Sequence, residues 1–543
     1  MKRAWLSRRQ FLKATGVLAA SNCFRPSSLF RFQGKRPNIL CITCEDISPM
    51  LGCYGDKVAR TPNLDRLASE GVKFTKVFSC SGVCAPSRFA LITGMYPSAC
   101  GANNMRTSSY LPEGIPPYEA VPPPQVRCFT EYLRASGYYC TNNEKTDYQF
   151  KVPITAWDEC SQRAHWKNRP SGMPFFAIFN LMTTHESQVW ERANDPVTIR
   201  PEEVLVPPYF PDTPVIRRDI ARVYNNITIM DREVGELIDE VKKAGLLEET
   251  IIIFYSDNGG PLPRGKRELY DSGLHVPMII RFPNQKHAGT EVDDLISFVD
   301  IPATILSLAG IQPPRYLHGR AFWGQFKSAP RQYIFAARDR MDSEYDVRRA
   351  VRDKRFKYIR NYRPDIGCYQ DIEFRKNLAS MRELLRLRDA GQLNQAQMYW
   401  FRKTKSPEEL YDLTADPDEL HNLADDPAYR DDLIRLRSAL EQWLDEVGDQ
   451  PLRGEKELVW SMWPGGVQPI TETPKIFKQG DSIEITCATP GASIAYQING
   501  KGYTRDHWFL YTKPLKIKPS NEIAVRAIRI GYQPSEIVSW KNN

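Results

Sequence analysis

The stretch CAPSRFALITG at residues 84–94 places a cysteine one helical turn before an arginine. Pro86 suits the first turn of a helix, and Gly94 can end it after the apolar residues between them. We therefore expect Cys84 at a helix N-terminus. Unpaired backbone N–H groups at such an end favour an anion such as sulfate and lower the pKa of a thiol. A buried structural cysteine is the alternative for any single residue of this type.

Apolar runs that alternate with helical patterns surround this segment. One helix is expected to begin at Thr61-Pro62 and close at Gly71, and a longer one is expected to end near Gly245. The alternation predicts an α/β fold with a doubly wound, mostly parallel sheet. The strand-like runs lie at residues 38–43, 175–183, 250–256 and 277–282.

The composition changes twice in the C-terminal half. After the segment IQPP at residues 311–314, charged strand and helix patterns predict a smaller α+β subdomain. From about Gly465, short alternating runs separated by Pro-Gly and Asn-Gly turns predict a small all-β sandwich. It resembles the C-terminal module of chitobiase and β-hexosaminidase type enzymes, and a spacer role is favoured over sugar binding. The predicted segments are 1–34, 35–325, 326–460 and 465–543.

The N-terminus resembles a twin-arginine export signal, with SRRQFLK at residues 7–13 before a mildly apolar run. Residues 1–34 hold seven Lys or Arg and no acid, so 66 basic and 65 acidic residues remain. This balance gives no support for nucleic-acid binding. No apolar run approaches the roughly 20 residues of a membrane span. We expect an exported, periplasmic or extracellular protein, soluble rather than lipidated at Cys23.

The spacing Cys-x-Pro-Ser-Arg-x-x-Leu-x-Thr-Gly from Cys84 to Gly94 resembles the signature of formylglycine-dependent sulfatases, in the alkaline phosphatase superfamily. The resemblance covers roughly residues 35–450. It implies that a maturation enzyme converts Cys84 to formylglycine, whose hydrated aldehyde attacks sulfur. Because the twin-arginine route exports folded proteins, this conversion is expected in the cytoplasm.

Oxygen ligands follow two predicted strands, as Glu45-Asp46 and Asp257-Asn258. The carboxyl ends of strands are where open α/β sheets gather their chemistry, and hard oxygen donors suit Ca²⁺ or Mg²⁺. The resemblance implies one metal ion, Ca²⁺ first, held by these four residues and position 84. The family usually has Asp-Asp where this chain has Glu45-Asp46, so Glu45 is the less certain ligand.

The resemblance also supplies groups for binding sulfate and moving a proton. Lys266 matches a lysine that binds sulfate, and Arg88 matches the arginine that holds the formylglycine oxygen. Lys145 matches the lysine of a Lys-x-His element and is expected to offset charge on the sulfuryl oxygens. His185 matches the histidine that protonates the leaving group, a role suited to its pKa near neutrality. Asp147 stands where histidine is usual, and we expect it to bond Lys145, a formylglycine hydroxyl or a substrate amine. The secondary candidates are His275 and Arg281.

These motifs predict an enzyme that releases sulfate from a sulfated carbohydrate, nearest to the heparan N-sulfatase-like branch. The bond cleaved is a sulfuric ester or a sulfamate. A phosphodiesterase or phosphonate hydrolase of the same superfamily is one alternative, and a glycan-binding protein with an inactive core is the other. The sugar and the oligomeric state are left open by the sequence.

Overall fold

The computed structural model describes residues 36–541, so the predicted export signal and Cys23 lie outside the described residues. Within this range the largest sheet has nine strands in the order β4-β3-β5-β1-β6-β7-β2-β8, with β9 beside β2. Its strands are β1 (Asn38–Cys44), β2 (Val72–Phe78), β3 (Tyr139–Asn143), β4 (Glu159–Cys160), β5 (Phe175–Leu181), β6 (Thr250–Ser256), β7 (His275–Arg281), β8 (Thr290–Val292) and β9 (Ile296–Ser297).

The sheet is mostly parallel, as predicted. Parallel pairing joins β4, β3, β5, β1 and β6, and also joins β2 to β8 and β9. The exception is β7, which runs antiparallel to both β6 and β2. Because β5, β1 and β6 are adjacent and parallel, their carboxyl ends meet at one edge of the sheet.

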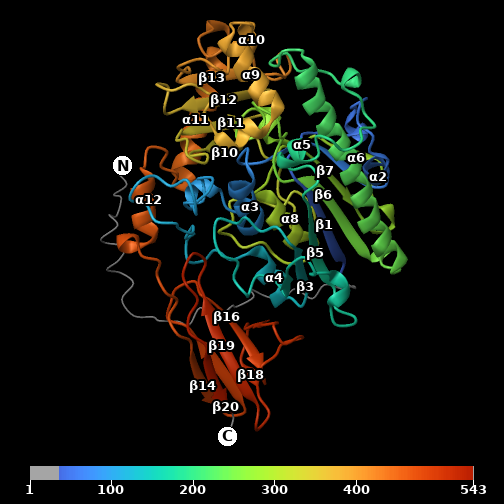
Figure 1. Ribbon diagram of the computed structural model, residues 1–543. Coiled ribbons are helices and arrows are strands. Elements are labelled where there is room, and N and C mark those ends of the chain that lie inside the picture. Colours follow the sequence, from blue (N-terminus) through green and yellow to red (C-terminus); the bar gives the residue numbers. More distant parts are fainter. Residues whose placement is uncertain (1–35, 542–543) are drawn as a thin grey trace.

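Helices cover both faces of the sheet, which makes it doubly wound (Figure 1). Side chains alternate along β1, so Ile39 and Cys41 enter one core while Leu40 and Ile42 enter the other. The first core contains α3 (Cys84–Thr93), α4 (Phe129–Ala135) and α8 (Asp300–Leu308). The second contains α2 (Pro62–Ser69) and the long helix α6 (Pro214–Lys243), with the short α5 (Ser187–Glu191) beside α6.

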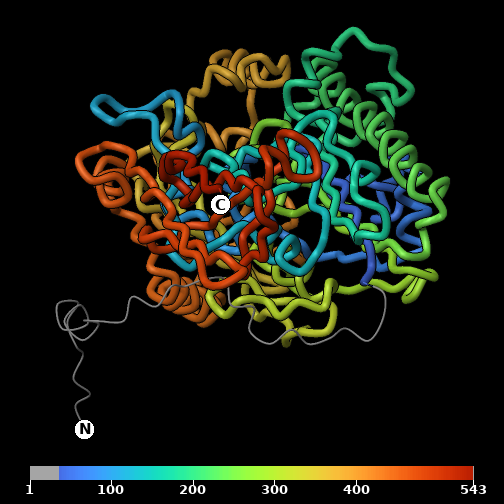
Figure 2. The backbone as a smooth tube through the Cα atoms, turned by 90° about the horizontal axis from the view of Figure 1, so that it is seen from below, coloured from blue at the N-terminus to red at the C-terminus, as the bar shows by residue number. Residues whose placement is uncertain are grey.

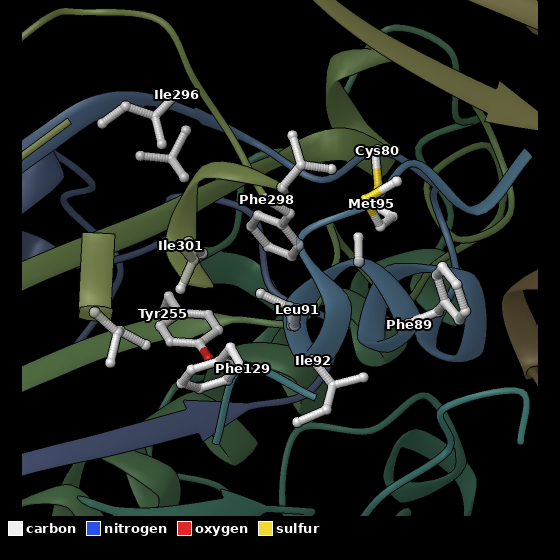
Figure 3. Packing of buried hydrophobic residues seen from close by; sticks show 14 of the residues in the cluster. Cys80, Phe89, Leu91, Ile92, Met95, Phe129, Tyr255, Ile296, Phe298 and Ile301 are labelled. Carbon is white, nitrogen blue, oxygen red and sulfur yellow. The ribbon is translucent and has the colours of Figure 1, made fainter. Parts of the chain in front are cut away.

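The helix of the CAPSRFALITG segment lies deep in the first core. Leu91 and Ile92 lie on the side of Phe129, Tyr255 and Ile301 of α8 (Figure 3). Phe89 points away from them, and its ring packs against Phe150. The helix ends at Gly94, which adopts the left-handed conformation with φ 69°, as predicted from its position. Burial on all sides fixes this helix against the sheet.

The following segment forms a smaller α+β unit, as predicted. Its antiparallel sheet has the order β10-β11-β12-β13. Helix α11 (Arg430–Val447) packs against β11 and β12 (Figure 1), and residues of α11 and the sheet contribute to the first core. The elements are β10 (Ile334–Arg338), β11 (Arg348–Arg352), β12 (Phe356–Asn361), β13 (Glu408–Asp412), α9 (Ala379–Asp389), α10 (Gln395–Met398), α11 (Arg430–Val447) and α12 (Glu455–Met462).

The C-terminal strands form two packed antiparallel sheets, in the orders β14-β15-β18 and β17-β16-β19-β20. Ile483 and Ile485 of one sheet pack against Ile523 and Val525 of the other, so the module is the predicted all-β sandwich. Figures 1 and 2 show it beside the β3 and α4 end of the core. The strands are β14 (Lys475–Gln479), β15 (Ser482–Thr486), β16 (Ser493–Ile498), β17 (Phe509–Leu510), β18 (Leu515–Lys516), β19 (Glu522–Ile528) and β20 (Val538–Lys541).

Three further features bear on the sequence predictions. No helix among residues 36–541 is long and apolar enough to cross a membrane. Every cysteine that the structure describes is free, and Cys41 and Cys44 point into opposite cores rather than toward a shared ion. The exact segment boundaries drawn from composition stay a prediction.

Candidate active site

The carboxyl ends of β1 and β6 bring together the four oxygen ligands predicted from sequence. Glu45, Asp46, Asp257 and Asn258 are all fully buried. Carboxylate oxygens of Glu45, Asp46 and Asp257 lie within 4.8 Å of one another. Asp46 has a left-handed φ of 51°, a conformation that costs energy for a residue other than glycine and is common at functional sites.

Cys84 lies next to this carboxylate group, at the start of α3. Its Sγ is 3.6 Å from Glu45 Oε2, and Cys84, Glu45 and His185 each place a ligand atom within 4.8 Å of the others. The preceding Gly82 lets the chain approach closely, because a Cβ there would lie 2.3 Å from the Glu268 carbonyl oxygen. The fold therefore holds position 84 against the carboxylates.

The prediction of a lowered thiol pKa for Cys84 is wrong. Burial raises the pKa of this thiol, and although the charges of Lys145 and Lys266 lower it, they do not compensate. The carboxylates of Asp257 and Glu45 raise it further. Removal from water thus outweighs the helix N-terminus, so Cys84 as a thiol is a poor nucleophile.

Arg88 lies one turn after Cys84 and reaches the same group of carboxylates. Its Nε donates to Asp257 Oδ2 at 3.0 Å, and one terminal nitrogen donates to Glu45 Oε1. The other donates to Asn180 Oδ1 at 2.8 Å. Burial, and after it the Glu45 carboxylate, raises the pKa of Asp257 to about 7, although the charge of Arg88 lowers it.

The two lysines predicted to act on the sulfuryl group also converge here. Lys145 follows β3, and its Nζ is 2.6 Å from Glu45 Oε2. Lys266 donates to Asp46 Oδ2 and lies 3.5 Å from Glu186 Oε1. Lys266 is buried, whereas the Lys145 side chain is 16% exposed, so solvent reaches the site from the Lys145 side.

His185 follows β5 and is half-buried beside Glu45 and Cys84. Burial and the charge of Lys266 lower its pKa to about 4. The imidazole is therefore neutral near pH 7. Its Nδ1 lies 3.2 Å from both the hydroxyl and the backbone nitrogen of Ser187, which hold the ring.

Asp147 and the secondary candidates have different positions. Asp147 makes no hydrogen bond or ion pair with any described residue, so the expected bond to Lys145 is absent, and Lys145 pairs with Glu45 instead. Its φ of 51° is left-handed. His275 stacks on Phe78, and Arg281 pairs with acids at the far end of β7, so neither joins the site.

Three residues of the site were missed from sequence. Asn180 near the end of β5 orients Arg88, and Glu186 binds Arg267 through paired hydrogen bonds of 2.7 and 2.9 Å. The backbone nitrogen of Glu186 also donates to Asp46 Oδ2 at 2.8 Å. Glu186 and Arg267 directly follow His185 and Lys266, and this adjacency was the available signal.

The residues fit a divalent cation. The side-chain oxygen Oδ1 of Asn258 is buried and has no hydrogen-bond donor among the described residues, while its nitrogen donates to Asp46 Oδ1 at 2.9 Å. A buried acceptor without a partner is costly, and a cation next to the carboxylates would satisfy it. The donor set contains hard oxygens, which suit Ca²⁺ or Mg²⁺.

Comparisons with known proteins agree with this geometry. The Sulfatase family model matches residues 37–151 and 159–311, and the model for the C-terminal part of N-sulphoglucosamine sulphohydrolase matches residues 264–397. A protein of Formosa agariphila named ulvan-active sulfatase is 48% identical, over 93% of this chain and 91% of its own. The human N-sulphoglucosamine sulphohydrolase is 26% identical, over 76% of this chain and 90% of its own.

The chain belongs to the sulfatase family and is an enzyme of the hydrolase class. The predicted likeness to the N-sulfatase branch is confirmed by the match to the C-terminal model. Members of this family generally use formylglycine and a divalent metal.

Solved structures share the fold. A protein in complex with its substrate D-glucosamine-2-N,6-O-disulfate superposes with a TM-score of 0.56 at 18% identity, over 77% of this chain and 99% of its own. The phosphonate monoester hydrolase of Agrobacterium radiobacter superposes with a TM-score of 0.55 at 19% identity, over 77% of this chain and 97% of its own. At this identity the likeness concerns the fold alone, so the alternative of a phosphonate hydrolase gains nothing from it.

Proposed function

We propose that this enzyme removes sulfate from a sulfated polysaccharide of the ulvan type, with formylglycine formed from Cys84. The observation that carries the proposal is the approach of Cys84, Glu45 and His185 to within 4.8 Å beside two lysines. The ulvan-active relative supports the choice of sugar because its identity of 48% extends over nearly the whole chain. Neither alternative predicted from sequence is favoured over this activity.

The charges around position 84 explain how the site could receive a sulfate. Carboxylates and cations are equal in number before a metal is added, so a divalent ion would leave an excess of positive charge for an anionic substrate. The carboxylates are Glu45, Asp46, Asp257 and Glu186, and the cations are Arg88, Lys145, Lys266 and Arg267.

Each side chain has a role that its position allows. The formylglycine supplies a hydrated aldehyde whose hydroxyl displaces the leaving group at sulfur. Lys145 and Lys266 hold the sulfuryl oxygens, and Arg88 orients the residue at position 84. His185 gives its proton to the departing oxygen or nitrogen, because the arriving sulfate raises its pKa from about 4.

We infer that the ion is Ca²⁺, with Mg²⁺ as the alternative. Glu45, Asp46, Asp257 and Asn258 would hold it, together with the oxygen at position 84. The buried, unpartnered Oδ1 of Asn258 supports this donor set. Its chemistry would be to neutralise charge on the sulfuryl group.

Asp147, like Glu45, departs from the usual pattern of the family. Since it makes no bond to a described residue, we infer that it acts on the formylglycine hydrate or on a substrate group. An Asp147→Ala variant tests this because turnover should fall while thermal stability stays within about 0.5 kcal/mol of the parent. Unchanged turnover would remove Asp147 from the site.

Maturation and export are proposed from the N-terminal sequence. A cytoplasmic formylglycine-generating enzyme would act on Cys84 before the folded protein leaves by the twin-arginine machinery, for the periplasm or the exterior. A replacement of Arg8 and Arg9 by lysine should retain the active enzyme in the cytoplasm, as cell fractionation would show.

The substrate is tested by sulfate release from three sets of oligosaccharides: ulvan fragments, N-sulfated glucosamine and 6-O-sulfated glucosamine. The proposal predicts release from ulvan fragments. Release from only the N-sulfated sugar would change the proposed substrate from an ulvan sulfate ester to a sulfamate, which the match to the C-terminal family model alone would suggest. Phosphate release from a phosphonate ester in excess of sulfate release would overturn the sulfatase assignment.

A further inference from the structure

A cavity of about 510 Å³ lies between the α/β core and the C-terminal sandwich. Its core side is lined by Trp157, Arg163 and Asn168, among other residues of the segment around β4, and its sandwich side by Thr504, Asp506 and Trp508. It is separate from the site around Cys84, since no residue of that site lines it. Its volume is within the range of sites for small ligands, roughly 300–1,000 Å³.

The two sides of the cavity are held together by a buried polar network. Arg134 of α4 donates to the Trp508 carbonyl oxygen at 2.7 Å and pairs with Asp158 at 2.9 Å. His507 Nε2 lies 2.8 Å from the same carboxylate of Asp158. Because these groups are almost completely buried, the loop that carries Trp508 has a fixed position against the core.

The lining has the chemistry of a sugar site. The Trp508 side chain is half-buried at the cavity, and an indole ring offers an apolar face to the C–H face of a pyranose. Asp506 and Arg163 are exposed at the cavity, and their side chains form no hydrogen bond or ion pair with any described residue. Their groups are thus available to the hydroxyls and acidic groups of a sugar.

The cavity lies along the same sheet as the active site. Its residues Glu159 and Cys160 form β4, which pairs with β3, and Asn142 of β3 donates to both Cys160 Sγ and the Lys145 carbonyl oxygen at 3.3 Å. In the order β4-β3-β5-β1, three strand spacings of about 4.8 Å separate β4 from β1, or roughly 14 Å. A glycan chain of a few sugars can cover this distance.

We propose that this cavity binds a sugar of the polysaccharide chain, a few residues from the sugar that loses its sulfate. The sandwich is then a part of the substrate-binding surface and not only a spacer. The inference rests on the proposed function, since it assigns a second contact to the same substrate. Its consequence is that the enzyme prefers long fragments, and that the preference depends on Trp508.

The test uses the matured full chain and compares Trp508→Ala with the parent on ulvan oligosaccharides of increasing length and on 4-nitrophenyl sulfate. For long fragments we expect kcat/KM to fall about threefold to tenfold, as for the loss of one aromatic contact. Activity on 4-nitrophenyl sulfate should stay unchanged. The substitution keeps the carbonyl that Arg134 binds, and Asp506→Ala gives a second variant at an exposed side chain.

Phe477→Ala and Asp481→Asn are the matched controls, because both residues are exposed on the sandwich and neither lines the cavity. Binding of ulvan oligosaccharides to a Cys84→Ala protein, with and without Trp508→Ala, gives a readout that needs no turnover. Equal affinity of the two proteins, or an equal loss of kcat/KM at every length, overturns the inference. Absence of sulfate release from every sugar would overturn the proposed function instead, while the affinities still decide the role of the cavity.

Discussion

The guanidinium of Arg88 donates to the carboxylate of Glu45 in a place that solvent does not reach, since their side chains are 3% and 0% exposed. A second carboxylate, Asp257, accepts from Nε of the same arginine. The planar fork of arginine directs separate N–H groups at the two acids, whereas a lysine carries its charge at a single nitrogen on a side chain without this fixed geometry. Arg88 therefore fixes the spacing of the two acids beside Cys84.

We predict that Arg88→Lys lowers turnover about 100-fold, because the acids and the residue at position 84 lose their alignment. The free energy of unfolding should fall by about 3 kcal/mol, as for other disrupted buried pairs. Chemical denaturation and sulfate-release kinetics check both numbers. Arg60→Lys is the control: Arg60 pairs with Glu203 at the surface, so a change of similar size there would refute the explanation by burial.

His185→Gln should reveal the proton donor through its dependence on the leaving group. A sugar hydroxyl needs a proton as it departs, whereas 4-nitrophenolate does not. We expect a loss of roughly 10²–10⁴ in kcat on sulfated sugars but less than tenfold on 4-nitrophenyl sulfate. The exposed His421 provides the control variant His421→Gln. Equal losses on both substrates would assign His185 to binding and not to proton transfer.

Binding of Ca²⁺ should depend on Asn258. Because its buried Oδ1 has no other partner, we predict that saturating Ca²⁺ raises the Tm of the parent protein clearly. Asn258→Ala should have a smaller rise, and its half-saturation should need at least about tenfold more Ca²⁺. Thermal scans over a Ca²⁺ titration measure both effects. Identical titrations of the two proteins would exclude Asn258 as a ligand.

Low pH should reduce the free energy of unfolding through His318, in addition to the effect of protonating the protein's carboxylates. Burial and the charge of Arg331 lower the pKa of His318 to about 4, and its Nδ1 accepts from the Tyr96 backbone nitrogen at 3.1 Å. Between pH 6.5 and 4 the unfolded chain binds a proton at this histidine that the folded chain does not, so stability falls as pH falls through this window. The contribution is about 3 kcal/mol.

His318→Gln should flatten the pH dependence of the free energy of unfolding between pH 6.5 and 4, relative to the parent at each pH. His421→Gln should leave the curve unchanged, because that side chain is 79% exposed. If the free energy of unfolding of His318→Gln falls with pH as steeply as that of the parent, His318 does not cause the pH dependence.

The sequence was sufficient for the fold class and for bringing together the residues that we predict to hold the metal ion. Apolar strands followed directly by Glu45-Asp46 and Asp257-Asn258 predict that these groups meet, since adjacent parallel strands end at one edge. The direction of β7 could not be predicted in this way. The pattern of an apolar strand does not specify whether its neighbour is parallel, and the connection at residues 257–274 is long enough for either direction, so only the structure shows the antiparallel pairing.

Interactions between distant segments were also beyond the sequence. Asn180 has an ordinary position in a strand, and only the fold shows that it orients Arg88. The lowered thiol pKa expected for Cys84 was wrong because burial depends on tertiary packing, which a local motif does not encode. The cavity at Trp508 likewise needs two segments more than 300 residues apart in sequence.

The most direct test of the central claim is sulfate release from ulvan oligosaccharides by protein produced with a formylglycine-generating enzyme, with mass spectrometry of the peptide that contains Cys84. We predict formylglycine at position 84 and sulfate release in proportion to it, with none from Cys84→Ala. Fully converted protein that releases no sulfate from any sulfated sugar, or a Cys84→Ala variant that retains the activity of the parent, would contradict this account.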